Sequence, residues 1–198
     1  NKGMISFGNE KSYYSGGKSV KELAEILLSS ETIAARVKEL GAEITTDYQG
    51  KEIIIIGILK GALPFMADLI REINIPLKYD LMAVSSYGVS TKTSGAVQIL
   101  KDIEMGIEGE HVLVVEDIID TGLTLNYLVG NLLSRKPASL KICTLLDKPS
   151  RREVEIFPQY NGFTIPDRFV VGYGLDYAER FRHLPMIGVL KPEVYEKK

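Results

Sequence analysis

The chain has 198 residues, of which 45% are hydrophobic and 25% are charged, and its formal net charge is −2. This length suits one domain with a sizeable core, and the composition is ordinary for a soluble globular protein. The nearly balanced charge, with lysines and arginines dispersed along the chain, argues against a nucleic-acid-binding protein.

Membrane insertion and secretion are not expected. The longest apolar run, residues 53–59, has only the length of a strand. No apolar stretch follows the first basic residue, as a signal peptide would require. The single cysteine, Cys143, lies in an apolar run and is expected to pack in the core, since it cannot form an internal disulfide. A reducing, cytoplasmic location fits. Met4 could be the native start, so one domain is expected over residues 4–198.

Two helices are predicted before the first buried strand. Residues 19–22 have the capping-box pattern, and Val20, Leu23 and Leu27 follow at helical spacing. A second helix is predicted to stop at Gly41. Its apolar residues are Ile33, Val37 and Leu40.

The first strong strand signal is residues 52–59, followed by the turn Lys60-Gly61 and a helix in which Pro64 suits the first turn. A lysine beside exposed helix N–H groups suits an oxyanion. Lysines often end strands, so this signal alone is weak. The apolar face of the helix is Met66, Leu69, Ile70 and Ile73.

A strand is predicted over residues 78–84, and a small, polar, glycine-containing loop follows at 85–95. A loop of this length in a compact domain is usually functional or mobile. Residues 98–102 are expected to return from it as a short strand.

The stretch from His111 to Thr124, HVLVVEDIIDTGLT, carries the densest chemical signal. Residues 112–115 predict a buried central strand, and apolar residues at helical spacing from Leu125 to Leu133 predict a helix after it. In the turn between them, helix N–H groups, Gly122 and threonine hydroxyls suit a phosphate. Carboxylates nearby suit a sugar diol or Mg²⁺. These carboxylates belong to Glu116, Asp117 and Asp120. A buried strand with a few polar residues at its end is the plainer alternative, but buried carboxylates are costly.

The run of residues 140–146 predicts a fourth strand, and Lys148 follows it, where open α/β sheets bind ligands. A cation there could bond a carbonyl oxygen. Arg151 and Arg152 are interpreted as a solvated charge cluster. Residues 153–167 contain two prolines and a glycine and are interpreted as a connector with little regular structure.

Two more short strands are predicted, at residues 168–172 and 186–190, and residues 191–198 are expected to be a frayed polar tail. Phe169 could stack on a base, although an aromatic in an apolar strand usually packs in the core. The glycines from Gly172 on do not form a dinucleotide-binding fingerprint, because position 177 is tyrosine and no helix begins there.

Alternation of strands and helices over residues 52–146 predicts an α/β fold with a mainly parallel, twisted sheet flanked by helices. The core is expected over about 50–150. The terminal segments, about 4–25 and 153–190, are expected to form a small hood.

The segment EDIIDTGLT, residues 116–124, closely resembles the signature with which type I phosphoribosyltransferases bind phosphoribosyl pyrophosphate (PRPP), most of all in the branch that acts on hypoxanthine and guanine. Three further motifs resemble the family in the expected order, so the resemblance runs from about Val20 to Leu190. One departure is Ala62, where the family usually has a second glycine, because alanine tolerates positive φ poorly. The three motifs are Leu59-Lys60-Gly61, Ser86-Tyr87-Gly88 and RFVVGYGLDYAERFR at residues 168–182.

The resemblance implies a role for each matching residue on the PRPP side. Glu116 and Asp117 would hold the ribose hydroxyls, and Lys60, Gly61 and Arg182 the pyrophosphate. The flexible loop of Ser86, Tyr87 and Gly88 would close over the reaction. The 5′-phosphate would be cradled by Thr121, Gly122, Leu123 and Thr124. The implied cofactor is Mg²⁺, held near Glu116, Asp117 and Asp176.

On the purine side, the resemblance implies that Asp120, also in the PRPP motif, accepts a proton from the base. Lys148 would contact the 6-oxygen of the purine. The implied purine-binding residues are Lys148, Phe169, Val170 and Asp176. The implied partners are PRPP and a 6-oxopurine, in a homodimer or homotetramer, with no nucleic acid and no membrane.

Two other functions stay open. One is a transferase that prefers xanthine, which would differ mainly in residues 148–182. The other is a PRPP-sensing regulator without catalysis, but the sequence lacks the basic domain that such a regulator needs and retains Asp120, Lys60 and Arg182.

Overall fold

The structure is a computed structural model, and it describes residues 6–7, 10–11, 13–15, 18–86 and 97–196. They fall into two compact units, one of residues 36–167 and one of the described residues in 1–35 and 168–198. The first unit holds a six-stranded sheet and the second a three-stranded sheet.

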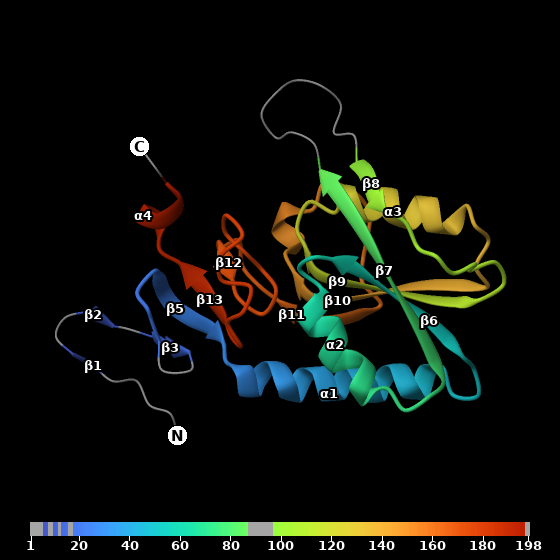
Figure 1. Ribbon diagram of the computed structural model, residues 1–198, viewed down its shortest axis with the longest axis horizontal. Helices are drawn as coiled ribbons and strands as arrows, with labels where there is room; N and C mark the ends of the chain where they lie inside the picture. Colours follow the sequence, from blue (N-terminus) through green and yellow to red (C-terminus); the bar gives the residue numbers. More distant parts are fainter. Residues whose placement is uncertain (1–5, 8–9, 12, 16–17, 87–96, 197–198) are drawn as a thin grey trace. The chain divides into compact units, whose positions relative to one another are not determined.

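The six-stranded sheet has the strand order β11-β10-β9-β6-β7-β8 (Figure 1). β8 runs antiparallel to β7, and every other neighbouring pair is parallel, so the predicted mainly parallel sheet is confirmed. In chain order its strands are β6 (Ile53–Leu59), β7 (Leu77–Ser86), β8 (Val97–Lys101), β9 (His111–Ile119), β10 (Ser139–Asp147) and β11 (Tyr160–Thr164).

Helices cover this sheet because alternate residues of its buried strands point to opposite faces. On one face, Ile54, Ile56 and Val114 pack in one cluster with Leu128 and Leu132 of α3 (Leu123–Leu133). On the other face, α2 (Leu63–Glu72) lies so close to β6 that a Cβ on Gly57 would be 2.2 Å from Met66 Sδ. Cys143 is buried in β10, as predicted.

The helix α1 (Ser30–Asp47) does not stop at Gly41, so that prediction is wrong. Gly41 serves close packing instead, since a Cβ there would lie 2.5 Å from Glu72 Cβ at the end of α2. The predicted connector over 153–167 is wrong in part, because β11 within it extends the sheet beside β10. No helix among the described residues combines the length and apolarity needed to cross a membrane.

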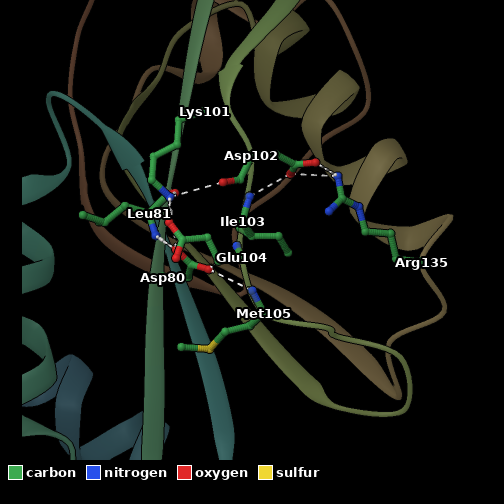
Figure 2. Close-up of polar contacts among 8 residues, drawn as sticks. All are labelled: Asp80, Leu81, Lys101, Asp102, Ile103, Glu104, Met105 and Arg135. Atoms are coloured by element: carbon green, nitrogen blue, oxygen red, sulfur yellow. Dashed lines mark hydrogen bonds and ion pairs between the residues drawn. The ribbon is translucent and has the colours of Figure 1, made fainter.

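The segment after β8 is held by a polar network (Figure 2). The Asp80 carboxylate on β7 accepts hydrogen bonds from the backbone N–H groups of Leu81, Glu104 and Met105, at 2.7, 2.6 and 3.2 Å. Asp102 pairs with Arg135, which follows α3, at 2.8 Å. The network therefore ties β7, the segment after β8 and the carboxyl end of α3 together.

The second unit is built on the antiparallel order β12-β13-β5, with β5 (Leu23–Leu28), β12 (Val170–Val171) and β13 (Ile187–Leu190). Leu23 and Val171 are in its core. The capping-box prediction of a helix near Val20 is wrong, because pairing of β5 with β13 outweighs a local pattern. The tail also forms a short helix, α4 (Pro192–Tyr195), which the prediction of a frayed end missed. The remaining short strands are β1 (Ser6–Phe7), β2 (Glu10–Lys11), β3 (Tyr13–Ser15) and β4 (Lys18–Val20).

Candidate active site

Three neighbouring strands of the first unit, β10, β9 and β6, end at the same edge of the sheet. The residue that follows each of them was predicted as a site residue: Lys148, Asp120 and Lys60. The ends of β10 and β9 are level, because Asp147 pairs with Ile119, and the Lys148 N–H donates to the Ile119 carbonyl at 3.0 Å. Ligands of open α/β sheets bind at this edge.

A cavity of about 260 Å³ lies beside the strand ends. It brings together the residues of the first unit that were predicted to bind the 5′-phosphate, the ribose or the pyrophosphate, with the exception of Leu123, whose side chain is exposed. Arg182, also predicted for the pyrophosphate, belongs to the second unit. Sequence reasoning missed the apolar wall of the cavity, since runs of buried isoleucine and leucine give no signal of a cavity. The predicted residues in its lining are Lys60, Gly61, Glu116, Asp117, Asp120, Thr121, Gly122 and Thr124. The apolar residues are Ile58, Leu59, Val84, Ile118, Ile119 and Leu125.

Glu116 and Asp117 form an adjoining acidic pair in this lining. The Asp117 N–H donates to Glu116 Oε1 at 3.3 Å, and the Ile118 N–H donates to Asp117 Oδ1 at 2.8 Å. Burial, and then the charge of Asp117, raise the pKa of Glu116 well above its usual range. The pair therefore favours a bound proton, or a cation in its place.

The donor set fits Mg²⁺, which proteins often hold with one or two carboxylates together with water and substrate phosphates. Glu116 and Asp117 supply two such carboxylates. Over the described ranges, no three or more His, Cys, Asp and Glu side chains gather as a metal site of their own. Magnesium would therefore need oxygens of the substrate.

The turn between β9 and α3 has the geometry expected of an anion site. Gly122 has a φ of 83°, which favours glycine, and its carbonyl accepts from the Asn126 N–H at 2.8 Å. The Glu153 N–H donates to the Thr121 carbonyl at 2.9 Å, so the chain after β10 supports the turn from outside. Thr121, Gly122 and Thr124 line the cavity, so the beginning of α3, where a helix binds anions, lies beside it.

Ala62 is compatible with the turn after β6. Its φ of −71° and ψ of −9° lie in the right-handed helical region, so this position does not require glycine. At Gly61, in contrast, a Cβ would lie 1.6 Å from Asp117 Oδ2, so a side chain there would displace the Asp117 carboxylate.

Arg151 and Arg152, interpreted as a solvated cluster, behave differently from each other. Arg152 is 9% exposed, pairs with Asp147 and donates to the carbonyls of Asp120 and Ile156, so the prediction that it is solvated is wrong. It fixes the backbone beneath the strand ends. Arg151 is 46% exposed but donates from Nε to Asp120 Oδ1 at 2.9 Å. Two arginines three and four residues after a site lysine were the signal that could have found both.

Four of the other predicted site residues, Phe169, Val170, Asp176 and Arg182, lie in the second unit. The Phe169 ring stacks on Tyr195, with centroids 4.8 Å apart, and is 38% exposed. Val170 is buried in β12. Asp176 pairs with Arg182 at 2.9 Å, and Arg182 also donates to the Gly174 carbonyl. Ser86 is the last residue of β7, whereas Tyr87 and Gly88 lie outside the described residues.

Parallel strands that end in a phosphate-binding turn, a basic turn and a second lysine define an α/β protein built for a phosphorylated ligand. Residues 24–178 match the family of the phosphoribosyl transferase domain. The chain belongs to the phosphoribosyltransferase family, and its predicted resemblance to the hypoxanthine-guanine branch is confirmed by the relatives.

Two relatives and one solved structure illustrate the match. The hypoxanthine-guanine phosphoribosyltransferase of Bacillus subtilis (strain 168) is 58% identical over 175 residues, which cover 88% of this chain and 97% of that protein. The protein of the same name from Lactococcus lactis subsp. lactis (strain IL1403) is 52% identical over 177 residues, covering 89% and 96%. A crystal structure of a hypoxanthine phosphoribosyltransferase from Staphylococcus aureus has a TM-score of 0.86 at 54% identity and covers 89% of this chain and 96% of that one.

Proposed function

We propose that the chain transfers the phosphoribosyl group of PRPP to hypoxanthine or guanine, releasing pyrophosphate and forming IMP or GMP in purine salvage. The observation that carries this proposal is the placement of Lys60, Asp120 and Lys148 directly after three adjacent strands, with Lys60 and Asp120 in the lining of one cavity. Relatives of similar length that are named for this reaction support it.

PRPP would enter with its 5′-phosphate at the turn of residues 121–124, where helix N–H groups and threonine hydroxyls donate to phosphate oxygens. Glu116 and Asp117 would accept hydrogen bonds from the ribose diol. Lys60 and the Gly61 turn would take the pyrophosphate, together with Arg182. This order accounts for carboxylates lying beside two anion sites, because they face a sugar rather than a phosphate.

The purine would donate a ring proton to the Asp120 carboxylate as its nitrogen bonds to the anomeric carbon and pyrophosphate leaves. Lys148 would donate to the 6-oxygen, which adenine lacks. Phe169 and Val170 would contact the ring. The Lys148 ammonium facing the 6-position thus favours a 6-oxopurine. It does not distinguish hypoxanthine, guanine and xanthine, which all have this oxygen.

Magnesium would be held by Glu116, Asp117 and substrate oxygens, with Asp176 near it, and it would neutralise charge on the departing pyrophosphate. Glu116 would then lose the proton that its raised pKa favours. The residues of the second unit, together with the segment of Ser86, Tyr87 and Gly88, are proposed as a hood and a loop that exclude water from the reacting carbon. A homodimer or homotetramer remains a prediction that light scattering would measure.

The test is pyrophosphate release with PRPP, supplying hypoxanthine, guanine, xanthine, adenine and uracil separately, with Mg²⁺ or with EDTA. Turnover with hypoxanthine or guanine that EDTA abolishes is the expected result. Turnover with xanthine alone would move the proposal to the xanthine-preferring transferase. If no base gives pyrophosphate release while PRPP still binds, the proposed enzymatic function is overturned in favour of a PRPP-sensing regulator.

A further inference from the structure

Four charged side chains of alternating sign form a chain across the strand ends of the first unit. Arg151 Nε donates to Asp120 Oδ1 at 2.9 Å. Arg151 Nη1 lies 3.5 Å from Asp167 Oδ2, and Lys148 Nζ lies 3.7 Å from Asp167 Oδ1. We call Asp120, Arg151, Asp167 and Lys148 the charge chain.

Asp167 links the two cations of the charge chain, since one of its carboxylate oxygens faces Lys148 and the other faces Arg151. The Lys148 side chain is only 8% exposed, and a buried ammonium needs a carboxylate close by to offset the loss of its hydration. Asp167 lies directly before the second unit begins and is 52% exposed. Its place is set through Ile165, whose N–H donates to the Asp147 carbonyl at 2.9 Å.

Arg151 holds one oxygen of Asp120, Oδ1, and Asp120 lines the cavity. Its backbone is fixed next to Lys148, because the Arg151 N–H donates to the Lys148 carbonyl at 3.1 Å in a short 3-10 turn, Pro149–Arg151. A guanidinium also suits the role through its planar donors, which fix the direction of a carboxylate better than an ammonium does.

The ion pairs of the charge chain that involve Arg151 join side chains that are 43% to 52% exposed. Pairs of this exposure contribute little to folding, so stability does not explain their arrangement. The charge chain instead connects two groups of the proposed site. Asp120, at one end, is proposed as the base, and Lys148, at the other end, is proposed to bind the 6-oxygen.

We infer that Arg151 and Asp167 are positioning residues for the purine half of the reaction, Arg151 by orienting the Asp120 carboxylate and Asp167 by holding both Arg151 and Lys148. This inference deepens the proposed function and rests on it. Purine recognition at Lys148 and proton acceptance at Asp120 then depend on one shared carboxylate.

The inference is tested by steady-state kinetics of Arg151→Gln and Asp167→Asn. For each variant, the concentration of hypoxanthine is varied in one series and the concentration of PRPP in another. Arg151→Gln is expected to lower kcat about tenfold, the size of a lost hydrogen bond to a charged group, with the KM for PRPP unchanged. Asp167→Asn is expected to raise the KM for hypoxanthine by about tenfold and to lower kcat as well. Arg151→Lys keeps the charge and should recover part of kcat.

The double variant adds a second readout. Arg151 and Asp167 act through one contact, so the losses of the two single variants should not multiply in the double variant. The matched control is the pair Lys78–Glu52, at 2.8 Å and with 49% and 44% exposure, outside the cavity lining. Lys78→Gln should leave kcat and both KM values as in the wild type.

Suppose that the wild type turns over, but Arg151→Gln and Asp167→Asn match Lys78→Gln in kcat and in both KM values. This result would overturn the inference about the charge chain and leave the proposed function standing. Equal losses for PRPP and hypoxanthine, with a lowered thermal midpoint, would also overturn it, since that is the pattern of a structural role. A wild-type enzyme that turns over no purine would overturn the proposed function and the inference with it.

Discussion

A Cβ atom on Gly61 would lie 1.6 Å from Asp117 Oδ2, so the turn after β6 and the acidic pair at the end of β9 fit together only while residue 61 has no side chain. The two residues are far apart in sequence and lie side by side in the lining of one cavity. The basic turn and the carboxylate therefore form one surface rather than two independent motifs.

Gly61→Ala should impair catalysis more than folding. The clashing atom is the end of the Asp117 side chain, which can swing away, but it would then leave the ribose diol. We expect kcat/KM for PRPP to fall about tenfold to a hundredfold, as for the loss of one charge-assisted hydrogen bond. Gly106→Ala is the control, because a Cβ there meets no atom within 4 Å. A Gly61→Ala enzyme with wild-type kcat/KM would contradict the packing.

Two glycines of the α3 region should respond to alanine in opposite directions. Gly122 has a φ of 83°, and a Cβ there would lie 2.7 Å from Ile156 Cγ2, so Gly122→Ala should destabilise the fold by at least about 1–2 kcal/mol. Gly130 lies inside the helix with open space around it, so Gly130→Ala should stabilise it by about 0.5–1 kcal/mol. Urea unfolding measures both, and destabilisation by Gly130→Ala would contradict the open space at that position.

Sequence periodicity was sufficient for the strands and helices of residues 52–146, because buried parallel strands are continuous apolar runs and their helices have one apolar face. It failed where a distant partner decides the local structure. Residues 19–27 have a helical cap and helical spacing, yet β13 pairs with Leu23–Leu28 as a strand. Gly41 looked like a helix stop, and only the approach of Glu72 explains why glycine is there.

The neighbours Arg151 and Arg152 show the same limit at the site, and they give a further prediction. Arg152 and Asp147 are 9% and 11% exposed, so Arg152→Gln would leave a buried carboxylate without its cation. We expect a loss of about 3–5 kcal/mol in the free energy of unfolding for Arg152→Gln and little change for Arg151→Gln, whose ion pairs are exposed to solvent. Chemical denaturation of the two variants side by side measures the contrast. Equal losses of unfolding free energy in the two variants would show that the buried Arg152 does not stabilise the fold more than Arg151 does.

Asp120→Asn tests the proposed base while keeping the shape of the site. Asparagine retains an oxygen that can accept from Arg151 Nε, and the phosphate turn is unchanged, so PRPP should bind as in the wild type. Removal of a general base typically costs about 10²–10⁴-fold, and kcat should fall by that amount. Isothermal titration with PRPP and a turnover assay separate the two properties. Wild-type turnover would show that Asp120 is not the base.

The network around Asp80 and Asp102 should make stability depend on acid pH (Figure 2). Burial raises the pKa of Asp80, but the N–H groups of Leu81, Glu104 and Met105 outweigh it, so the pKa lies below its usual range. The hydrogen bond from Arg135 lowers the pKa of Asp102. Each carboxyl thus stabilises the fold in its ionised form.

This stabilisation is complete above the pKa of an unfolded aspartate, about 3.9, and is lost as the pH falls through the lower values of the folded protein. Asp80→Ala should cost about 2 kcal/mol at neutral pH, since three backbone donors lose their acceptor, and its deficit relative to the wild type should shrink on acidification. For Asp102, which is 49% exposed, the same change should stay below about 1 kcal/mol, and Arg135→Gln should reproduce most of it. Urea unfolding from neutral pH down to about pH 3 follows the wild type and the three variants through this range. A deficit for Asp80→Ala that stays constant over that range would show that its ionised carboxylate does not hold the segment after β8.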